Sequence, residues 1–376
     1  MRYDYIFCGF GLSTLLLLEE LHSQKLLTEK NILILEMQTS FREQTWCFWE
    51  QGSGKWDNLL SGQWHSGIFK DETTSKEILG RLSYKSIDAK TLRNYVTDLL
   101  VPYSCDFKNE EVLDWSDRGN EVSVQTSHQT YIARYFFNSA YQQANESLQS
   151  PVLLQHFVGW FVECAADVFN PDQAIIMDFS VPQNGNTRFM YVLPFSKNTA
   201  LVEYTLFSPA LIPPAEYGAA IQDYLHQQGI ADYQVTKKEK GVIPMTCHPF
   251  WKKNTKNVLH IGTGGGWTKA SSGYTFTNAS KFSRSIGQLL KQDKADFRHF
   301  HQANRFGWYD RLFIDVLYNE NWVGKRLFRS LFMRTKSDDV MRFLNEESTL
   351  TQDMGIIWAC PKLPFLRALI NVVFKK

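Results

Sequence analysis

Apolar residues at the start of the chain occur in an order that predicts a strand, a turn, a helix and a second strand. The run YDYIFC at 3–8 has the length and composition of a buried strand, and the turn GFGLST follows it at 9–14. The leucine-rich segment 15–27 predicts a helix, and NILILE at 31–36 predicts a second buried strand that ends in an acid. This order begins a βαβ unit, which is typical of a parallel sheet covered by helices.

The rest of the chain shows three patterns. Residues 39–80 have no regular period and predict irregular structure. Apolar runs between about 153 and 207, separated by turns such as PQNGN, predict an antiparallel sheet inserted into the first domain. The tail, 296–376, predicts aromatic helices. Further strands are predicted at 105–113, 120–127, 130–138, 233–240 and 257–262, and further helices at 88–100 with Asp88 as N-cap, at 214–228 and up to about 291.

One predicted strand, ALVEYTLF at 200–207, carries a carboxylate among apolar side chains. Because side chains alternate along a strand, one face is formed by Leu201, Glu203, Thr205 and Phe207. Glu203 can lie on a solvated face, as most single glutamates in strands do. Alternatively it faces an apolar pocket, where burial would raise its pKa and let it exchange a proton near neutral pH.

The first glycine motif follows the first strand. A dinucleotide-binding fingerprint requires Gly-x-Gly-x-x-Gly between a strand and a helix, and an acid about 20 residues later. Its backbone N–H groups then face the pyrophosphate at a helix N-terminus. Thr14 replaces the third glycine, which predicts looser helix–strand packing. We predict nucleotide binding rather than a plain glycine turn, through Gly9, Gly11, Ser13, Thr14 and Glu36.

A second glycine segment, IGTGGG at 261–266, also follows a buried strand and precedes a helix. Two-domain flavoproteins use such a late segment to cover the same cofactor, whereas NAD-only dehydrogenases do not need it. The alternative is a glycine-rich surface loop. The pair of segments therefore predicts FAD, with further contacts from Gly262, Gly264, Gly265, Gly266 and Gly273.

Composition and charge exclude several classes of function. The 376 residues carry a formal net charge of +1, so no basic surface predicts nucleic-acid binding. The six cysteines form no Cys-x-x-Cys pair, so we expect neither a metal site nor a disulfide framework. We expect no signal peptide, and the sequence contains no run of about 18 apolar residues. We expect a cytoplasmic protein whose membrane contact is peripheral, and no feature indicates an oligomeric state.

Six segments in a fixed order resemble the flavin-dependent lycopene cyclases of carotenoid-making bacteria and plants. They are QTWCFW (44–49), QHFVGWFVE (155–163), MDF (177–179), YVLPFS (191–196), LVEYT (201–205) and GGGWTKASSGYTF (264–276), with RFL and PFLRAL in the tail. The resemblance covers nearly the whole chain. The departures are Glu43-Gln44 for Asp-Arg, Asn138-Ser139-Ala140 for acid-Ser-Arg, Tyr204 for a second acid, and Thr14 for the third glycine.

The resemblance implies a fold and a division into domains. The expected class is α/β: an FAD-binding Rossmann-like domain of the glutathione reductase or hydroxylase type, an inserted antiparallel substrate sheet, and C-terminal helices. The FAD-binding domain is expected at 1–152 and 241–295, and the substrate sheet at 153–240. A helical, membrane-contacting region is expected at 296–376.

The resemblance also implies a reaction and the residues for it. Such enzymes use reduced FAD, kept reduced by NAD(P)H, without net redox change. The terminal double bond of a linear carotene such as lycopene is protonated, a six-membered ring closes, and a proton is lost. Glu203 is the expected acid, and Asp178 is the second candidate unless it is an ordinary sheet or turn acid. Aromatic candidates to line the site, each also a typical core residue, are Trp160, Phe179, Tyr191 and Trp267.

A long apolar substrate dissolved in lipid implies contact with the inner face of the cell membrane. The segments 321–334 and 364–376 have the composition of interfacial helices, or of ordinary packed amphipathic ones. Two other functions stay open. One is an FAD-dependent oxidoreductase of the same architecture, such as a monooxygenase or prenyl reductase. The other is an inactive flavin- or carotenoid-binding relative.

Overall fold

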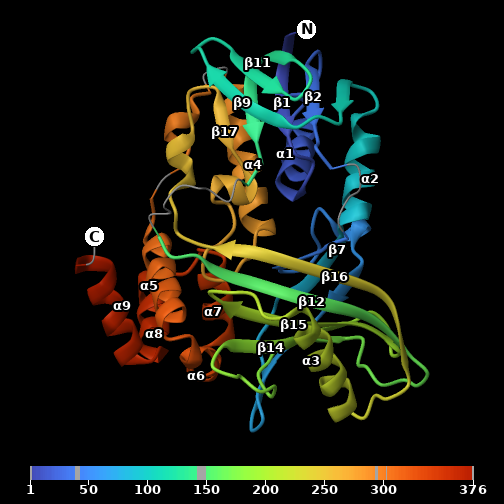
Figure 1. Cartoon of the computed structure of the whole chain (residues 1–376), viewed down its shortest axis with the longest axis vertical. Coiled ribbons are helices and arrows are strands. Elements are labelled where there is room, and N and C mark those ends of the chain that lie inside the picture. The colour runs from blue at the N-terminus through green and yellow to red at the C-terminus, as the bar shows by residue number, and fades with distance from the viewer. Residues whose placement is uncertain (1, 39–42, 142–149, 293–294, 302, 375–376) are drawn as a thin grey trace.

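A computed structural model describes residues 2–38, 43–141, 150–292, 295–301 and 303–374. Figure 1 shows a first sheet with its helices at the end of the molecule that holds the N-terminus. A second sheet of long strands crosses the middle of the molecule, and the last helices lie beside it (Figure 1).

The first sheet contains the predicted βαβ unit. It consists of β1 (Arg2–Cys8), β2 (Asn31–Leu35), β8 (Ser104–Lys108), β9 (Val112–Asp117), β10 (Val122–Thr126), β11 (Thr130–Asn138) and β17 (Val258–His260). The strand order is β8-β2-β1-β11-β10-β9, and β17 pairs with β11. Strands β8, β2, β1, β11 and β17 are parallel, while β9 and β10 add an antiparallel edge. The late strand β17, predicted as a buried strand, thus joins the first sheet beside β11.

Three helices pack around this sheet: α1 (Leu12–Ser23), α2 (Ala89–Leu100) and α4 (Phe276–Lys291). Helix α1 begins three residues before the predicted start because the glycine turn leads directly into it. Asp88 caps α2 as predicted, since its Oδ1 accepts hydrogen bonds from Lys90 N (2.9 Å) and Thr91 N (3.1 Å). The sheet and the helices share one apolar core, in which the buried rings of Phe7 and Phe137 stack 4.9 Å apart.

The second sheet has two covered faces. It consists of β5 (Ser66–Lys70), β6 (Ser75–Glu77), β12 (Leu153–Cys164), β13 (Gln173–Asp178), β14 (Thr187–Pro194), β15 (Thr199–Ser208) and β16 (Tyr233–Met245). Its order is β16-β12-β15-β14-β13-β5-β6. The pairs among β12 to β16 are antiparallel as predicted, and β13 with β5 adds a parallel pair. Helix α3 (Pro214–Gln227) packs on one face, and C-terminal helices pack on the other.

The prediction of irregular structure for 39–80 is wrong for its described part. That part contains β5 and β6 and two strands of a third sheet, which comprises β3 (Thr45–Glu50), β4 (Gly62–Trp64) and β7 (Ser83–Asp88). These strands are three to six residues long, too short for a sequence period to show. Residues 39–42 lie outside the described part.

The C-terminal helices differ in how much apolar surface they bury. They are α5 (Arg305–Asn319), α6 (Gly324–Arg334), α7 (Ser337–Leu344), α8 (Leu350–Ala359) and α9 (Lys362–Phe374). Helix α6 buries Leu327, Phe328 and Leu331, so this part of 321–334 is a packed amphipathic helix. Helices α8 and α9 instead expose large apolar side chains, among them Trp358 at 78% and Leu363 at 66%. Residues 375–376 of the second predicted interfacial segment lie outside the described part.

No single helix in the described ranges is long and apolar enough to cross a bilayer. The consecutive helices α8 and α9, which bend by 114° at their junction, reach that length and composition only as a pair.

The stacked pair in the first core gives a stability prediction. Phe137→Ala should lower the free energy of unfolding by about 3–5 kcal/mol, because it leaves a cavity in a fully buried cluster. Urea unfolding monitored by circular dichroism measures this loss. Phe107→Ala, at a position 46% exposed, should cost less than about 1 kcal/mol. Equal losses for the two variants would contradict the core assignment.

Candidate active site

One long cavity joins the first sheet, the second sheet and the C-terminal helices. Its volume is about 1300 Å³, above the roughly 300–1,000 Å³ of common small-molecule pockets. Gly11 lines it from the turn after β1 and Ser13 from α1. Glu203 and Tyr191 line it from the second sheet, and Leu366 from α9. Most of the other lining side chains are apolar or aromatic. The cavity therefore has room for a cofactor and for a long apolar ligand.

The turn between β1 and α1 forms a backbone cradle at this cavity. Gly9 has φ +86°, and a Cβ there would lie 2.3 Å from Ser139 Oγ, so a larger residue is excluded. A Cβ on Gly11 would meet no described atom within 4 Å, so this backbone faces open space. Gly11 precedes α1, and no described side chain caps that helix. The first-turn N–H groups of α1 are therefore available to an anion.

Of two further residues predicted to bind a nucleotide, Glu36 lines the cavity and Thr14 does not. Glu36 lines the cavity and accepts hydrogen bonds from Phe10 N (2.8 Å, to Oε2) and Gln38 N (2.8 Å, to Oε1). These bonds hold the carboxylate at the end of β2, beside the turn. Thr14 is fully buried and does not line the cavity, and its Oγ1 has no hydrogen-bond partner among the described residues. The position of the missing third glycine thus holds a packed side chain.

The late glycine segment meets the early one at the cavity. Gly262 (φ +62°) and Gly273 (φ +73°) line it, and a Cβ on Gly262 would lie 3.0 Å from Ser13 Oγ. The intervening glycines allow close backbone packing instead. A Cβ on Gly264 would lie 2.5 Å from a carbonyl oxygen, and a Cβ on Gly265 would lie 2.1 Å from another. Gly266 has φ +74°.

One face of the second sheet forms a wall of the cavity. The four residues predicted to share a face of β15 all line it: Leu201, Glu203, Thr205 and Phe207. Glu203 pairs with Tyr191 of β14 on one side and with Gly159 of β12 on the other. Gly159 pairs in turn with Glu239 of β16. The sheet therefore places two carboxylates on the same face, separated only by a glycine.

The Glu203 carboxyl is nearly dry. Its side chain is 7% exposed, and its Oε1 accepts a hydrogen bond from Thr205 Oγ1 at 2.5 Å. Burial raises the pKa of Glu203 well above its usual range, and the charge of Glu239 raises it further, against the opposing effect of the Thr205 hydrogen bond. Of the two interpretations of this glutamate, the structure supports the apolar pocket.

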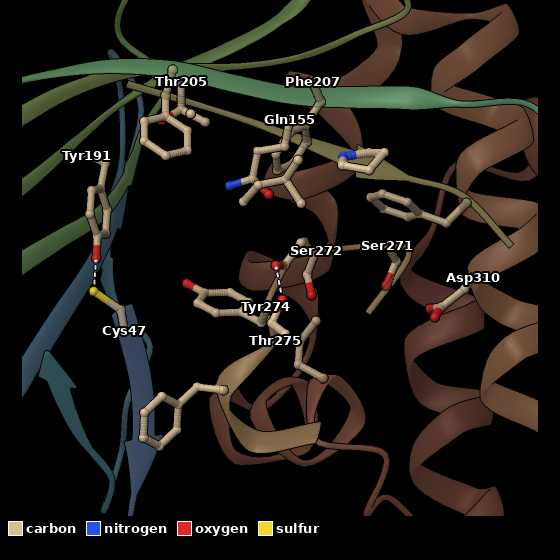
Figure 2. Close-up of a pocket in the computed structure, with 18 of the residues that line it drawn as sticks. Cys47, Gln155, Tyr191, Thr205, Phe207, Ser271, Ser272, Tyr274, Thr275 and Asp310 are labelled. Atoms are coloured by element: carbon tan, nitrogen blue, oxygen red, sulfur yellow. Dashed lines mark hydrogen bonds between the residues drawn. The ribbon is translucent and has the colours of Figure 1, made fainter. Parts of the chain in front are cut away.

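A chain of hydrogen-bonded hydroxyl and thiol groups adjoins Glu203. Tyr191 Oη lies 3.1 Å from Cys47 Sγ and 2.9 Å from Tyr84 Oη, and Tyr84 Oη lies 3.0 Å from Tyr274 Oη. Figure 2 shows the contact of Tyr191 with Cys47 and places Tyr274 on the facing wall. Burial raises the pKa of the Cys47 thiol to about 12, so this chain is uncharged near neutral pH.

The structure argues against Asp178 and Trp160 as site residues. Asp178 is buried on the α3 side of the sheet, where it forms an ion pair with Lys70 (2.9 Å) and accepts a hydrogen bond from Tyr224 Oη (2.8 Å). Trp160 pairs with Val202, on the face opposite Glu203, and packs in the cluster under α3. Neither residue lines the cavity.

Two further aromatic candidates are core residues. Trp267 is 2% exposed and packs against Phe282, with ring centroids 5.3 Å apart. Phe179 is fully buried and stacks on Phe328 of α6. Of the four aromatic candidates, only Tyr191 lines the cavity.

Sequence reasoning missed Glu239 and Gln155. Glu239 is 6% exposed, and its Oε2 accepts a hydrogen bond from Thr45 Oγ1 at 2.9 Å. In Figure 2, Gln155 extends from the second sheet toward Ser272, and the Gln155 Oε1 and Ser272 Oγ atoms have no hydrogen-bond partner among the described residues. A glycine inside a predicted strand, such as Gly159, was a usable signal, because it indicates a close approach.

Helices α8 and α9 border the far part of the cavity. Ile357 and Cys360, from α8 and the turn after it, line it together with Lys362, Leu363 and Leu366 of α9. Ile357, Leu363 and Leu366 are also 49%, 66% and 54% exposed. The same side chains thus face the cavity and the surface, as expected at an entrance.

The sequence model of the lycopene cyclase protein family matches residues 4–370 of this chain. The chain is 27% identical over 243 residues to a lycopene beta-cyclase of Pantoea ananas, a match that covers 60% of this chain and 61% of that protein. It is 30% identical over 151 residues to a lycopene beta-cyclase of Paracoccus sp. (strain N81106 / MBIC 01143), with 39% of each chain covered. The matched segments span less than two thirds of these relatives.

Solved structures show the same fold at low identity. The flavin-dependent brominase Bmp2 superposes with a TM-score of 0.62 at 12% identity, over 100% of both chains. A geranylgeranyl bacteriochlorophyll reductase-like protein from Thermoplasma acidophilum has a TM-score of 0.58 at 11% identity, over 100% of this chain and 97% of that one. These likenesses confirm the predicted fold class.

The buried carboxyl predicts how stability depends on pH. Because the pKa of Glu203 is raised on folding, the folded state holds a proton that the unfolded state releases. The free energy of unfolding therefore falls as pH rises from the unfolded pKa through the folded one. Glu203→Gln removes this loss. Relative to wild type, the variant should gain about 1 kcal/mol or more between pH 5 and pH 8.

Urea unfolding at both pH values measures this difference. Glu163→Gln, an exposed glutamate on the neighbouring strand, is the matched control and should follow wild type. A Glu203→Gln variant with the same pH dependence as wild type would show that Glu203 is not protonated by burial.

Proposed function

The chain belongs to the lycopene cyclase family, and on that premise we propose that it closes the linear ends of a carotene such as lycopene into β-ionone rings. The observation that carries this proposal is Glu203, a carboxyl group held in a dry, mostly apolar cavity. Protonation of an alkene needs an acid that is protonated at neutral pH and a site without water, because water would quench the cation.

The proposed reaction balances without an oxidant or a reductant. Glu203 gives its proton to the terminal double bond, which leaves a tertiary cation. The next double bond attacks this cation and closes the ring, and the positive charge moves to the ring. The Glu203 carboxylate then takes a proton from a ring carbon. The double bond of the ring forms, and Glu203 is protonated again. Product and substrate therefore have the same mass.

Side chains around Glu203 fit this sequence of steps. The Thr205 hydrogen bond fixes one carboxyl oxygen, and Tyr191 lies beside Glu203 on the neighbouring strand. The rings of Tyr191 and Tyr274 face the cavity, where aromatic faces stabilise a passing cation. Because the hydroxyl and thiol chain is uncharged, it supplies no competing base near neutral pH.

The glycine cradle and the late glycine segment fit FAD. Gly11 and the N-terminus of α1 would bind the pyrophosphate, Glu36 would accept from a ribose hydroxyl, and Gly262 and Gly273 would leave space for the rest of the cofactor. Reduced FAD would supply negative charge beside the cation. NAD(P)H is the proposed electron donor. The proposed domains are 1–152 with 241–295 for FAD and 153–240 for substrate, although β5 and β6 also join the second sheet.

We further propose that α8 and α9 dock on the inner face of the cell membrane. Their exposed apolar side chains lie at the entrance of the cavity, next to Lys362, which suits an anionic lipid surface. A lipid-dissolved carotene would then enter without crossing water.

The cyclase proposal predicts a product of unchanged mass. Purified protein with FAD, an anaerobic reductant and lycopene in liposomes should yield ringed carotenes, which liquid chromatography identifies by their shortened chromophore. Glu203→Gln should lower the rate at least ~100-fold because the proton donor is lost. Glu163→Gln should retain wild-type activity.

Three outcomes would contradict this proposal. Unchanged lycopene with wild-type protein would exclude lycopene as substrate. A product whose mass has changed, with NAD(P)H or oxygen consumed in proportion, would indicate an oxidoreductase of the same fold. Conversion that survives Glu203→Gln would remove Glu203 from the acid's role.

The membrane proposal predicts loss of vesicle binding when the exposed apolar residues are replaced. Trp358→Ser with Leu363→Ser should lower co-sedimentation with phosphatidylglycerol vesicles at least about tenfold, since each buried large side chain contributes ~1.5–3 kcal/mol. Val101→Ser with Leu113→Ser, at exposed apolar positions near the first sheet, is the control. Equal binding by both double variants would contradict docking through α8 and α9.

A further inference from the structure

We propose that Glu239 and Glu203 act as a carboxyl pair that holds one shared proton across Gly159, with Glu239 as the positioning residue that keeps Glu203 loaded. The role in turnover rests on the proposed cyclase function, whereas the pairing itself does not.

The sheet register brings the two carboxylates together. Glu203 on β15 and Glu239 on β16 both pair with Gly159 on β12, the strand between them. Their backbones are therefore two strand spacings apart, roughly 9–10 Å. A Cβ on Gly159 would lie 3.5 Å from Glu203 Cβ and 3.2 Å from Glu239 Cγ. The same Cβ would lie 2.7 Å from Leu201 Cδ1, so the absence of a side chain at Gly159 lets the side chains of Glu203 and Glu239 pack close to this strand beside Leu201.

Hydrogen bonds leave one oxygen of each carboxyl group for this interaction. Thr205 Oγ1 donates to Glu203 Oε1 (2.5 Å), and Thr45 Oγ1 donates to Glu239 Oε2 (2.9 Å). Both side chains line the cavity and are less than a tenth exposed. Two buried carboxyl groups that interact electrostatically cannot both ionise at low cost.

The charges around the pair act in both directions, because Lys237 lowers the pKa of Glu239 whereas Asp88 and Glu43 raise it. Lys237 lies two residues before Glu239 on β16, but it forms ion pairs with Glu43 and with Asp88 (3.6 Å). Arg93 of α2 interacts with Glu36 and also with Asp88 and Glu43. The other groups facing the pair are the neutral Cys47, Tyr191 and Tyr274. Lys237 and Arg93 thus each interact with several acids, and Lys240, next to Glu239 on β16, also lines the cavity.

This arrangement accounts for both halves of the proposed reaction. The charge of Glu239 keeps Glu203 protonated at neutral pH, so the acid is ready when a carotene end arrives. Once Glu203 has given up its proton, two carboxylates face each other. Their repulsion favours return of a proton from the ring carbon to Glu203, which completes the cycle.

The pH dependence of turnover tests the pair. Activity should fall as pH rises through the pKa of Glu203, because only the protonated form donates. In Glu239→Gln this fall should occur at a pH lower by about one unit or more, whereas Glu239→Asp should keep a fall close to that of wild type. A Glu239→Gln variant that is slower at every pH, with an unshifted fall, would show a merely structural role and would overturn the proposal.

A measurement without substrate separates this proposal from the cyclase itself. In protein labelled with ¹³C at the glutamate carboxyl carbon, nuclear magnetic resonance should show one carboxyl group that stays protonated near neutral pH. In Glu203→Gln and in Glu239→Gln, the remaining partner should titrate at a lower pH than in wild type. Unshifted titration of the remaining partner in both variants would disprove the pair. The coupled titration in a protein that converts no carotene would sustain the pair and refute the cyclase.

Discussion

The site depends on one constraint: a carboxyl group on the dry face of a β-sheet. Because side chains alternate along β15, burying Leu201, Thr205 and Phe207 in the cavity wall also buries Glu203 between them. The sheet cannot move this glutamate to the other face without moving the whole strand by one residue. Packing of the second sheet against α3 therefore fixes the acid, and the cavity's apolar lining keeps its proton in place.

The two sheets present different kinds of groups to different parts of the cavity. The first presents its glycine turn, its helix N-terminus and Glu36 to one part of the cavity, where a cofactor phosphate and ribose fit. The second presents acids and aromatic rings to a neighbouring part, and exposed side chains of α8 and α9 line a third part. A single cavity can thus bring a lipid-soluble substrate, an acid and a cofactor together.

The sequence predicted those features that depend on local periodicity or on a motif. The βαβ start, the buried strand at 257–262, the Asp88 cap and the shared face of 200–207 all have local signals. Features set by the pairing of distant strands were not accessible. Asp178 and Trp160 have the residue types expected of a site, but the register places both on the α3 face. Glu239 lies within KKEKG, where flanking lysines give the strand the appearance of a solvated one, and only its alignment with Gly159 shows its neighbour.

The most direct test of carotene cyclisation by Glu203 is the mass of the product formed in D₂O. The carboxyl proton exchanges with solvent, and the reaction adds it to the terminal double bond, whereas the proton lost later comes from a different carbon. Each ring should therefore carry one deuterium, while the product formed in H₂O keeps the mass of the substrate. A ringed product without deuterium, or one that differs from the substrate by two hydrogens or by an oxygen, would contradict a proton-initiated, non-redox cyclisation.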